Sequence, residues 1–260
     1  MKKAVALIVK EPLEIYLDFL AEFVSYDIYI IVDSDKELTE LTKIDKYLKL
    51  NFVQLKDEHC LEKGFKNVNF MGIKKLISGW DKALLFFSVI IPLKYDHVWF
   101  IEDDVFFLNE QVLINLDLKY PNQDLIANCD FDKTKVIEKN KKLTYFDWVW
   151  KQIDIKIERP WYAGMMCATR MSKKQLQGIR WYALKYKTLF FLEALFPTIT
   201  SYFKLSYAQP NELTTVTYRD VFFLEEDDDR LETHIFHPMK DLNKHKDLRN
   251  SVYENKNKIN

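Results

Sequence analysis

Three consecutive carboxylates are the residues of this chain best suited to chemistry. Glu102, Asp103 and Asp104 directly follow the apolar run 98–101 and precede a second apolar run, 105–107. The first run is typical of a buried strand, so the acids stand where a strand leaves the core. Neighbouring carboxylates with little water around them protonate unless a cation or hydrogen-bond donors face them. The pattern predicts a divalent metal site, with a solvated loop or helix cap as the alternative.

A late pair of histidines is a candidate source of a further ligand. His234 and His237 lie three apart in an extended apolar segment that ends at Pro238. Carboxylates with one imidazole suit Mn²⁺, and oxygen ligands alone suit Mg²⁺. A single histidine in such a segment is also common as an ordinary interior residue. The sequence does not show whether either histidine approaches the acids.

Glu193 is the favoured candidate for a catalytic base. It is the single acid in the aromatic segment 190–198, where loss of water would raise its pKa toward neutrality. A position on the polar face of a helix explains it equally well. Glu212 and Asp220 are less favoured candidates.

Composition excludes several classes of protein. With a formal net charge of −1, the chain has no overall positive field, so no nucleic-acid partner is expected. Its 5 glycines form neither a dinucleotide-binding nor a P-loop motif, so metal and side chains must hold the phosphates of any bound nucleotide. The 3 cysteines lack a C-x-x-C pair, which argues against a disulfide framework or zinc ribbon.

The apolar runs are too short for a signal peptide or a transmembrane span, so we expect a cytoplasmic protein. The aromatic and basic stretch 180–207 leaves one alternative open. It fits peripheral contact with a membrane surface, although a core helix with solvated lysines is the simpler interpretation.

The order of the elements predicts an α/β fold. Apolar runs and helical periodicity alternate, and Asp33 follows the second strand directly. Strands are predicted at 4–9, 28–32, 52–55, 98–101 and 125–128, and helices at 13–23 and 73–89. Because ligands collect at the carboxyl ends of parallel strands, Asp33 and the acidic triplet should share one edge of the sheet.

The second half of the chain differs in character. We predict a charged loop at 133–142, a strand at 161–168 that crosses Gly164, and a helix capped by Ser172. No linker divides the chain, so one domain is predicted over 1–245, followed by a polar tail at 246–260 that is frayed or an exposed helix.

These features together resemble a known class of enzymes. The strand that ends in Glu-Asp-Asp, Asp33, the strand around Gly164 and the segment from His237 to Lys240 are similar to the GT-A class of metal-dependent nucleotide-sugar glycosyltransferases, some of which write their D-x-D motif as E-D-D. The resemblance implies a single GT-A-like domain whose mostly parallel central sheet is flanked by helices. Residues 1–130 would form a Rossmann-like nucleotide-sugar-binding half and residues 131–245 an acceptor-binding half.

The resemblance also implies roles for the metal-site residues. Asp104 and His237 would bind Mn²⁺ or Mg²⁺, which bridges the donor diphosphate. Glu102 and Asp103 would lie near the ribose or behind the metal ligands.

Three further residues would bind the donor nucleotide. Asp33 would accept a hydrogen bond from the nucleobase. Lys82, on the helix before the motif, would face the nucleotide or a donor phosphate, and Lys240 would offset charge on the leaving diphosphate.

The activity implied is transfer of a sugar from a nucleoside-diphosphate sugar, in the first instance a UDP-sugar, to a hydroxyl of a glycan, glycoprotein or glycolipid. An inverting transfer would use a carboxylate base such as Glu193. Two alternatives stay open. One is a metal-dependent nucleotidyltransferase or phosphohydrolase, and the other is a non-catalytic nucleotide-sugar-binding homologue. The sequence names neither the donor sugar nor the acceptor.

Overall fold

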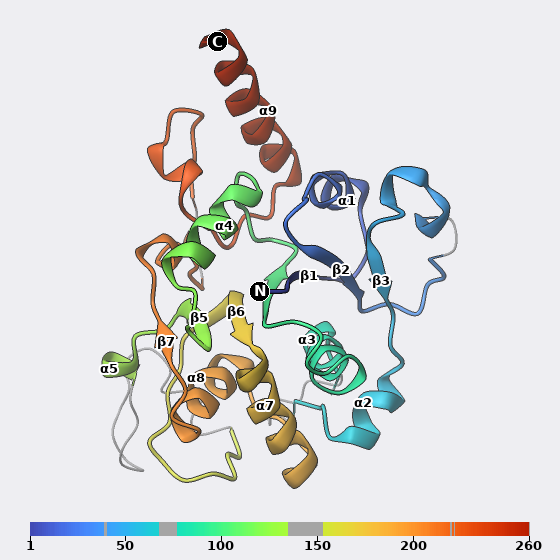
Figure 1. Ribbon diagram of the computed structural model, residues 1–260, viewed down its shortest axis with the longest axis vertical. Coiled ribbons are helices and arrows are strands. Elements are labelled where there is room, and N and C mark those ends of the chain that lie inside the picture. Colours follow the sequence, from blue (N-terminus) through green and yellow to red (C-terminus); the bar gives the residue numbers. More distant parts are fainter. Residues whose placement is uncertain (39–40, 68–76, 135–152, 219, 221, 260) are drawn as a thin grey trace.

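The chain forms a mixed sheet with helices on both faces (Figure 1). The computed structural model describes residues 1–38, 41–67, 77–134, 153–218, 220 and 222–259. Across these residues the sheet has seven strands in the order β3-β2-β1-β4-β6-β5-β7. Their bounds are β1 Lys3–Val9, β2 Asp27–Val32, β3 Asn51–Val53, β4 His97–Glu102, β5 Leu125–Asn128, β6 Met165–Ser172 and β7 Tyr207–Ala208. Only β6 runs antiparallel to its neighbours, so the predicted α/β fold with a mostly parallel sheet is confirmed.

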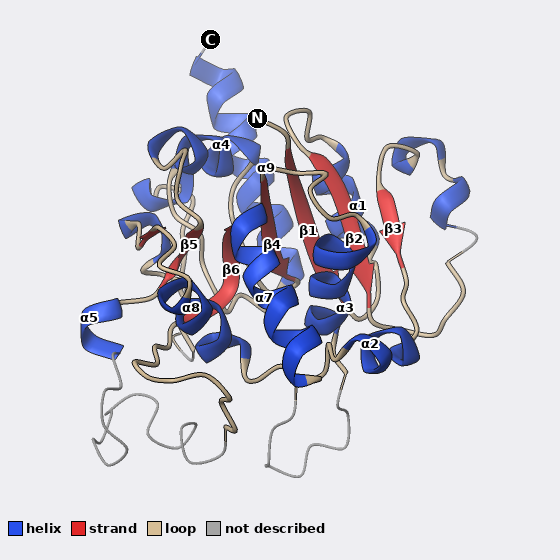
Figure 2. Cartoon of the chain, turned by 60° about the horizontal axis from the view of Figure 1, so that its bottom comes forward, coloured by secondary structure: helices blue, strands red, loops and turns tan. Residues whose placement is uncertain are grey.

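The helices cover the sheet in two layers. Figure 2 shows α3 and α7 in front of the strands. The helices are α1 Glu14–Ala21, α2 Asp57–Lys63, α3 Gly79–Leu85, α4 Glu110–Lys119, α5 Phe131–Thr134, α7 Lys173–Tyr186, α8 Leu192–Tyr202 and α9 Leu242–Ile259. A π-helical turn, Phe86–Ile90, continues α3.

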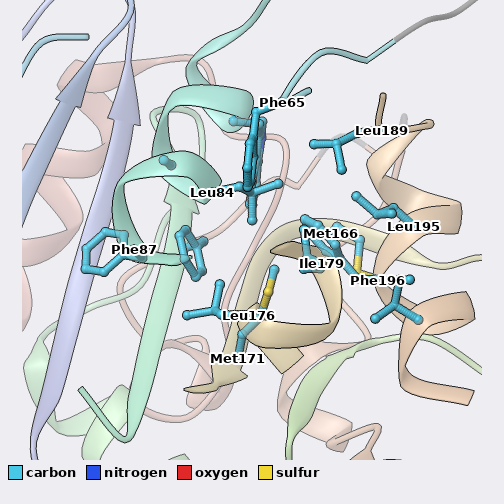
Figure 3. Packing of buried hydrophobic residues seen from close by; sticks show 14 of the residues in the cluster. Phe65, Leu84, Phe87, Met166, Met171, Leu176, Ile179, Leu189, Leu195 and Phe196 are labelled. Carbon is cyan, nitrogen blue, oxygen red and sulfur yellow. The ribbon is translucent and has the colours of Figure 1, made fainter. Parts of the chain in front are cut away.

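Each central strand contributes to two hydrophobic cores. In β1, Ala4, Ala6 and Ile8 pack toward α3, α7 and α8, while the alternate residues pack toward α1 and α4. Figure 3 shows Ile179 and Phe196 in the first of these layers. Successive side chains of a strand point to opposite faces, so a strand covered on both faces reads as one continuous apolar run. This is why the runs at 4–9 and 98–101 predicted strands correctly.

The strand order reverses between β1 and β4. From β1 the chain adds β2 and β3 on one side and then returns to place β4 on the other side of β1. In open α/β sheets ligands bind at such a point, in the crevice beyond the carboxyl ends of the strands. β4 ends there at Glu102, which is in register with Ile8 of β1.

Several predicted boundaries need correction. β6 begins only after Gly164, and not at residue 161, and it continues to Ser172. A Cβ on Gly164 would lie 2.5 Å from Cβ of Cys129, so the glycine permits a close crossing before the strand begins. Ser172 caps α7 as predicted, accepting hydrogen bonds from the backbone of Lys174 and Gln175.

The other differences concern loops and helices. The helix predicted at 73–89 begins at Gly79, with Ser78 as its N-cap. Residues 73–76 of that prediction lie outside the described part of the chain. The predicted loop at 133–142 starts inside α5, and its residues from 135 on also lie outside the described part.

The predicted tail forms part of a helix, α9, which crosses the boundary predicted at 245/246. Leu248 of α9 is buried, so this helix is not the exposed one that was expected. No helix in the described part of the chain has both the length and the apolar character needed to cross a membrane.

Candidate functional site

A backbone ladder joins the acidic triplet to the late histidine segment. Phe106 and Phe236 exchange two backbone hydrogen bonds of 2.8 Å, and the Met239 amide donates to the Asp104 carbonyl at 2.7 Å. These contacts place His237 beside the end of β4. Residues that are far apart in the sequence therefore meet at the switch point of the sheet.

His237 points one nitrogen at two carboxylates. Its Nε2 lies 3.2 Å from Oδ1 of Asp104 and 3.8 Å from Oε2 of Glu102. Its Nδ1 lies 2.7 Å from the carbonyl oxygen of Thr217, which can only accept a hydrogen bond, so Nδ1 carries a proton. In the neutral ring Nε2 then presents a lone pair to the carboxylates. That arrangement is unfavourable unless a proton or a metal ion lies between them, and it is the orientation of a metal-binding histidine.

The electrostatics of the cluster agree with this geometry. Burial alone would lower the pKa of His237, but the carboxylates of Asp104 and Glu102 outweigh it and raise the pKa. Burial likewise opposes ionisation of Asp104, yet His237 and Lys240 bring its pKa below the usual value. Burial raises the pKa of Glu102 despite the hydrogen bond from Trp80. Asp104 is thus the acid of this pair that stays ionised most readily.

The available ligand atoms fit a hard divalent cation. Possible ligand atoms of Glu102, Cys167 and His237 lie within 4.8 Å of one another, and Asp104 adjoins His237. Burial, reinforced by Glu102 and Glu193, raises the pKa of Cys167, so a metal ion would have to displace a proton to bind this sulfur. The carboxylate oxygens and the imidazole by themselves form a set that suits Mn²⁺.

Asp103 differs from its two neighbours. It lines a small pocket between α1 and α9, together with Tyr16 and Arg249. Burial and the adjacent Asp104 raise its pKa. The acidic triplet therefore divides, with Glu102 and Asp104 beside His237 and Asp103 against the helices.

Asp33 and Lys82 both lie at this end of the sheet, and they bind each other. Nζ of Lys82 lies 2.8 Å from Oδ1 of Asp33 and 2.9 Å from Oδ1 of Asp57, and the lysine side chain is only 2% exposed. Asp33 is 17% exposed and borders the crevice. An ammonium group that is covered and held by two carboxylates is not open to a phosphate, so this geometry does not support the phosphate contact expected for Lys82.

Lys240 and Glu193 lie near different carboxylates of the cluster. Lys240 is exposed and close enough to Asp104 to lower its pKa. Glu193 lies in the first turn of α8, and its Oε2 atom is buried without a hydrogen-bond partner among the described residues. Burial, followed by repulsion from Glu102, raises the pKa of Glu193 to about 8.

Three contributors to the site escaped sequence reasoning. Trp80 donates its indole N–H to Oε1 of Glu102 at 2.6 Å, Thr217 orients His237, and Cys167 adjoins the carboxylates. Trp80 appeared only as one apolar position of a helix, and no local pattern marks the other two.

Known proteins offer limited comparison. No protein-family model matches the sequence, and no curated protein matches it. Among solved structures, galactosyltransferase LgtC in complex with donor and acceptor sugar analogues has a TM-score of 0.48 at 12% identity, covering 96% of this chain and 96% of that chain.

Two other solved structures have similar scores. A 4-diphosphocytidyl-2C-methyl-D-erythritol synthase from Anaerococcus prevotii has a TM-score of 0.43 at 12% identity, covering 80% of this chain and 86% of that chain. A CMP:2-keto-3-deoxy-manno-octonic acid synthetase complexed with CTP has a TM-score of 0.40 at 10% identity, covering 81% and 89%. These neighbours are enzymes, but all three TM-scores lie below 0.5, so a functional assignment depends on the geometry of the site itself.

Proposed function

We propose that the protein is a metal-dependent glycosyltransferase that moves a sugar from a nucleoside-diphosphate sugar, in the first instance a UDP-sugar, to an acceptor hydroxyl. One observation carries this proposal. Nδ1 of His237 is committed to a backbone carbonyl while Nε2 faces Asp104 and Glu102, at the carboxyl end of β4 beside the switch point. The chain has no glycine loop that could bind phosphates, so a metal ion at this place would be needed to hold the donor diphosphate.

Each residue of the site has a separate role in this proposal. Asp104 and His237 would hold Mn²⁺ or Mg²⁺, which supplies positive charge to the leaving diphosphate. Exposed Lys240, which lies near Asp104, adds positive charge close to the metal ligands. Asp33 accepts a hydrogen bond from the nucleobase, and Lys82 holds its carboxylate in position.

Glu193 is the proposed base of an inverting transfer. With a pKa of about 8, this carboxylate is a strong base once it is ionised, but it is mostly protonated at neutral pH, so transfer should increase as the pH approaches 8. Glu193 lies in the first turn of α8, close enough to Glu102 for their charges to interact, and this supports its role beside the proposed metal site. The acceptor hydroxyl would lose its proton to this carboxylate as the oxygen attacks the sugar.

The first prediction tests the metal site. Asp104→Asn should abolish Mn²⁺-dependent release of UDP from UDP-sugars, because the amide supplies no charge to the metal. It should also remove the rise in melting temperature that UDP and Mn²⁺ together give the wild type. Asp96→Asn is the matched control, since Asp96 directly precedes β4 at its other end and pairs there with Lys173. Unchanged UDP release by folded Asp104→Asn protein would refute the proposal.

The reaction products separate the alternatives. A nucleotidyltransferase could use the same carboxylates and metal, but it would release pyrophosphate from a nucleoside triphosphate and a sugar phosphate. A phosphohydrolase would release orthophosphate. A non-catalytic binding protein would show the thermal shift without any product.

The acceptor is proposed to be a glycan, glycoprotein or glycolipid, and the last of these raises the question of a membrane surface. On α7 and α8, Trp181 stacks on Tyr202 and contacts Phe203, with Lys185 over the indole and exposed Lys204 next in sequence. Aromatic rings beside lysines suit an anionic bilayer interface. Flotation with phosphatidylserine vesicles should carry the wild type upward and leave a Tyr202→Ser/Phe203→Ser variant behind. Equal flotation of the wild type and the variant would exclude this surface as the site of membrane contact.

A further inference from the structure

The first turn of α3 contacts both ends of the candidate site. Trp80 donates to Glu102 at the end of β4, and Lys82 binds Asp33 at the end of β2. Residues two apart on a helix point in nearly opposite directions. β1 lies between β2 and β4, so one turn above β1 reaches both neighbouring strands.

Gly79 allows this turn to lie directly on β1. A Cβ at this position would come within 2.6 Å of Cγ2 of Ile8 and 3.3 Å of Cβ of Asp33. Any larger residue would push the turn away from the sheet. The closeness of α3 to the switch point therefore depends on the missing side chain.

The turn is also fixed in orientation. Ser78 and Asp81 form a capping box, in which the amide and the hydroxyl of Ser78 both donate to Oδ2 of Asp81 at 2.8 Å. This closes the start of the helix and limits rotation of the turn. The directions of the side chains at positions 80 and 82 are set together as a result.

Further contacts hold the side chains of Trp80 and Lys82. The Trp80 ring stacks on Phe100 with ring centroids 5.9 Å apart and contacts Phe196 at 5.6 Å. Lys82 is anchored by its second partner, Asp57 of α2. Both side chains are buried and held by these contacts, so each fixes the carboxylate that it contacts.

We infer that Trp80 and Lys82 are positioning residues that act on opposite ends of the donor: Trp80 through Glu102 on the metal and Lys82 through Asp33 on the nucleobase. This inference rests on the proposed function. It assigns the tuning of metal affinity and of base selectivity to two separate contacts made by one helical turn.

The test measures the two properties separately on the intact chain. Mn²⁺ affinity is measured by electron paramagnetic resonance, and UDP and CDP affinities by calorimetry with Mn²⁺ present. Uracil offers an N3–H to the Asp33 carboxylate, whereas cytosine has no hydrogen there. The ratio of UDP to CDP affinity therefore reports on Asp33.

Trp80→Phe keeps an aromatic ring at this position and removes the indole N–H. It should weaken Mn²⁺ binding about tenfold, in the range for residues that orient metal ligands, and leave the UDP-to-CDP ratio unchanged. Lys82→Met should reduce that ratio about tenfold and leave Mn²⁺ affinity unchanged. Lys82→Arg should recover part of the ratio.

Matched controls exist at the other end of β4. There Trp99 donates its indole N–H to Asp117 at 3.2 Å, and Lys3 binds Asp117 at 2.9 Å. Trp99→Phe and Lys3→Met remove the same kinds of bond and should move neither property. If Lys82→Met does not fold, Asp57→Asn is the substitute, because Asp57 is 44% exposed and should lower the ratio by loosening Lys82.

The outcomes distinguish the two levels of the proposal. Variants that shift both properties together, or neither, overturn the positioning roles while the proposed function stands. A wild-type protein that binds neither UDP nor CDP with Mn²⁺ overturns the proposed function, and the inference with it.

Discussion

His237 shows how a single backbone contact defines the chemistry of a side chain. Because the Thr217 carbonyl accepts the Nδ1 proton, Nε2 is the nitrogen left to face Asp104 and Glu102. Without this backbone carbonyl, the ring could turn its N–H group toward the two carboxylates and donate a hydrogen bond to them. In the proposed metal site, the orientation of this histidine is therefore set by a contact one step away from the ligands.

Glu193 gives a prediction at the same scale, on pH. Its folded-state pKa of about 8 lies above the ordinary glutamate value of 4.5, so between these pH values the folded state holds a proton that the unfolded state has lost. Stability from this residue therefore falls as pH rises from about 4.5 to about 8. Glu193→Gln mimics the protonated form and should escape that loss.

Thermal melts at several pH values test this sign. The melting temperature of Glu193→Gln minus that of the wild type should increase from pH 5 to pH 8, by several degrees in total. The variant should also lose transfer activity at every pH. A difference that stays constant with pH would show that Glu193 is ionised throughout the range.

At the scale of elements, the sequence predicts what is local. Continuous apolar runs identified the strands because helices cover both faces of the sheet, and Ser172 marked the start of α7 because a cap is a contact between near neighbours. The meeting of His237 with Asp104 depends on the ladder between Phe106 and Phe236, which no local pattern encodes. Asp33 follows β2 and Glu102 ends β4 at the same edge of the sheet, as the order of the elements predicted, but the pairing of Lys82 with Asp33 was not expected and depends on how α3 lies on β1.

Gly79→Ala tests that last point. In an exposed helix this change would stabilise the protein by about 1 kcal/mol, through helix propensity. Here the new methyl group would lie 2.6 Å from Ile8, so we expect a net loss of stability instead.

Since the whole turn would move, Mn²⁺ affinity and the UDP-to-CDP ratio should fall together, unlike in the variants that alter one contact. Chemical denaturation and the two binding measurements check this. A more stable variant with intact binding would show that the turn tolerates displacement.

At the scale of the whole molecule, the two ends of β4 have different tasks. At its carboxyl end the acids form the candidate site, whereas near its amino end Arg170 and Asp117 form an ion pair at 2.7 Å, with both side chains fully buried. Tyr26 and Trp99 also donate to Asp117. This cluster ties β4 and β6 to α4 and has no access to solvent.

Asp117→Asn should therefore reduce stability without changing the site. It leaves the buried guanidinium of Arg170 without its counter-charge, and breaking such a pair typically costs about 3–5 kcal/mol. Urea denaturation measures the loss, while Mn²⁺ and UDP affinities of the folded protein should match the wild type. Weakened binding in a folded variant would mean that the two ends of β4 are coupled.

The buried thiol of Cys167 has a consequence for competition among metals in a cell. Zinc binds nitrogen and sulfur ligands more tightly than manganese does, and it would prefer this cluster if the sulfur were ionised. Burial raises the pKa of this thiol, so a zinc ion that bound through the sulfur would have to displace a proton. Competition between zinc and manganese at the proposed metal site should therefore shift in favour of zinc as the pH rises.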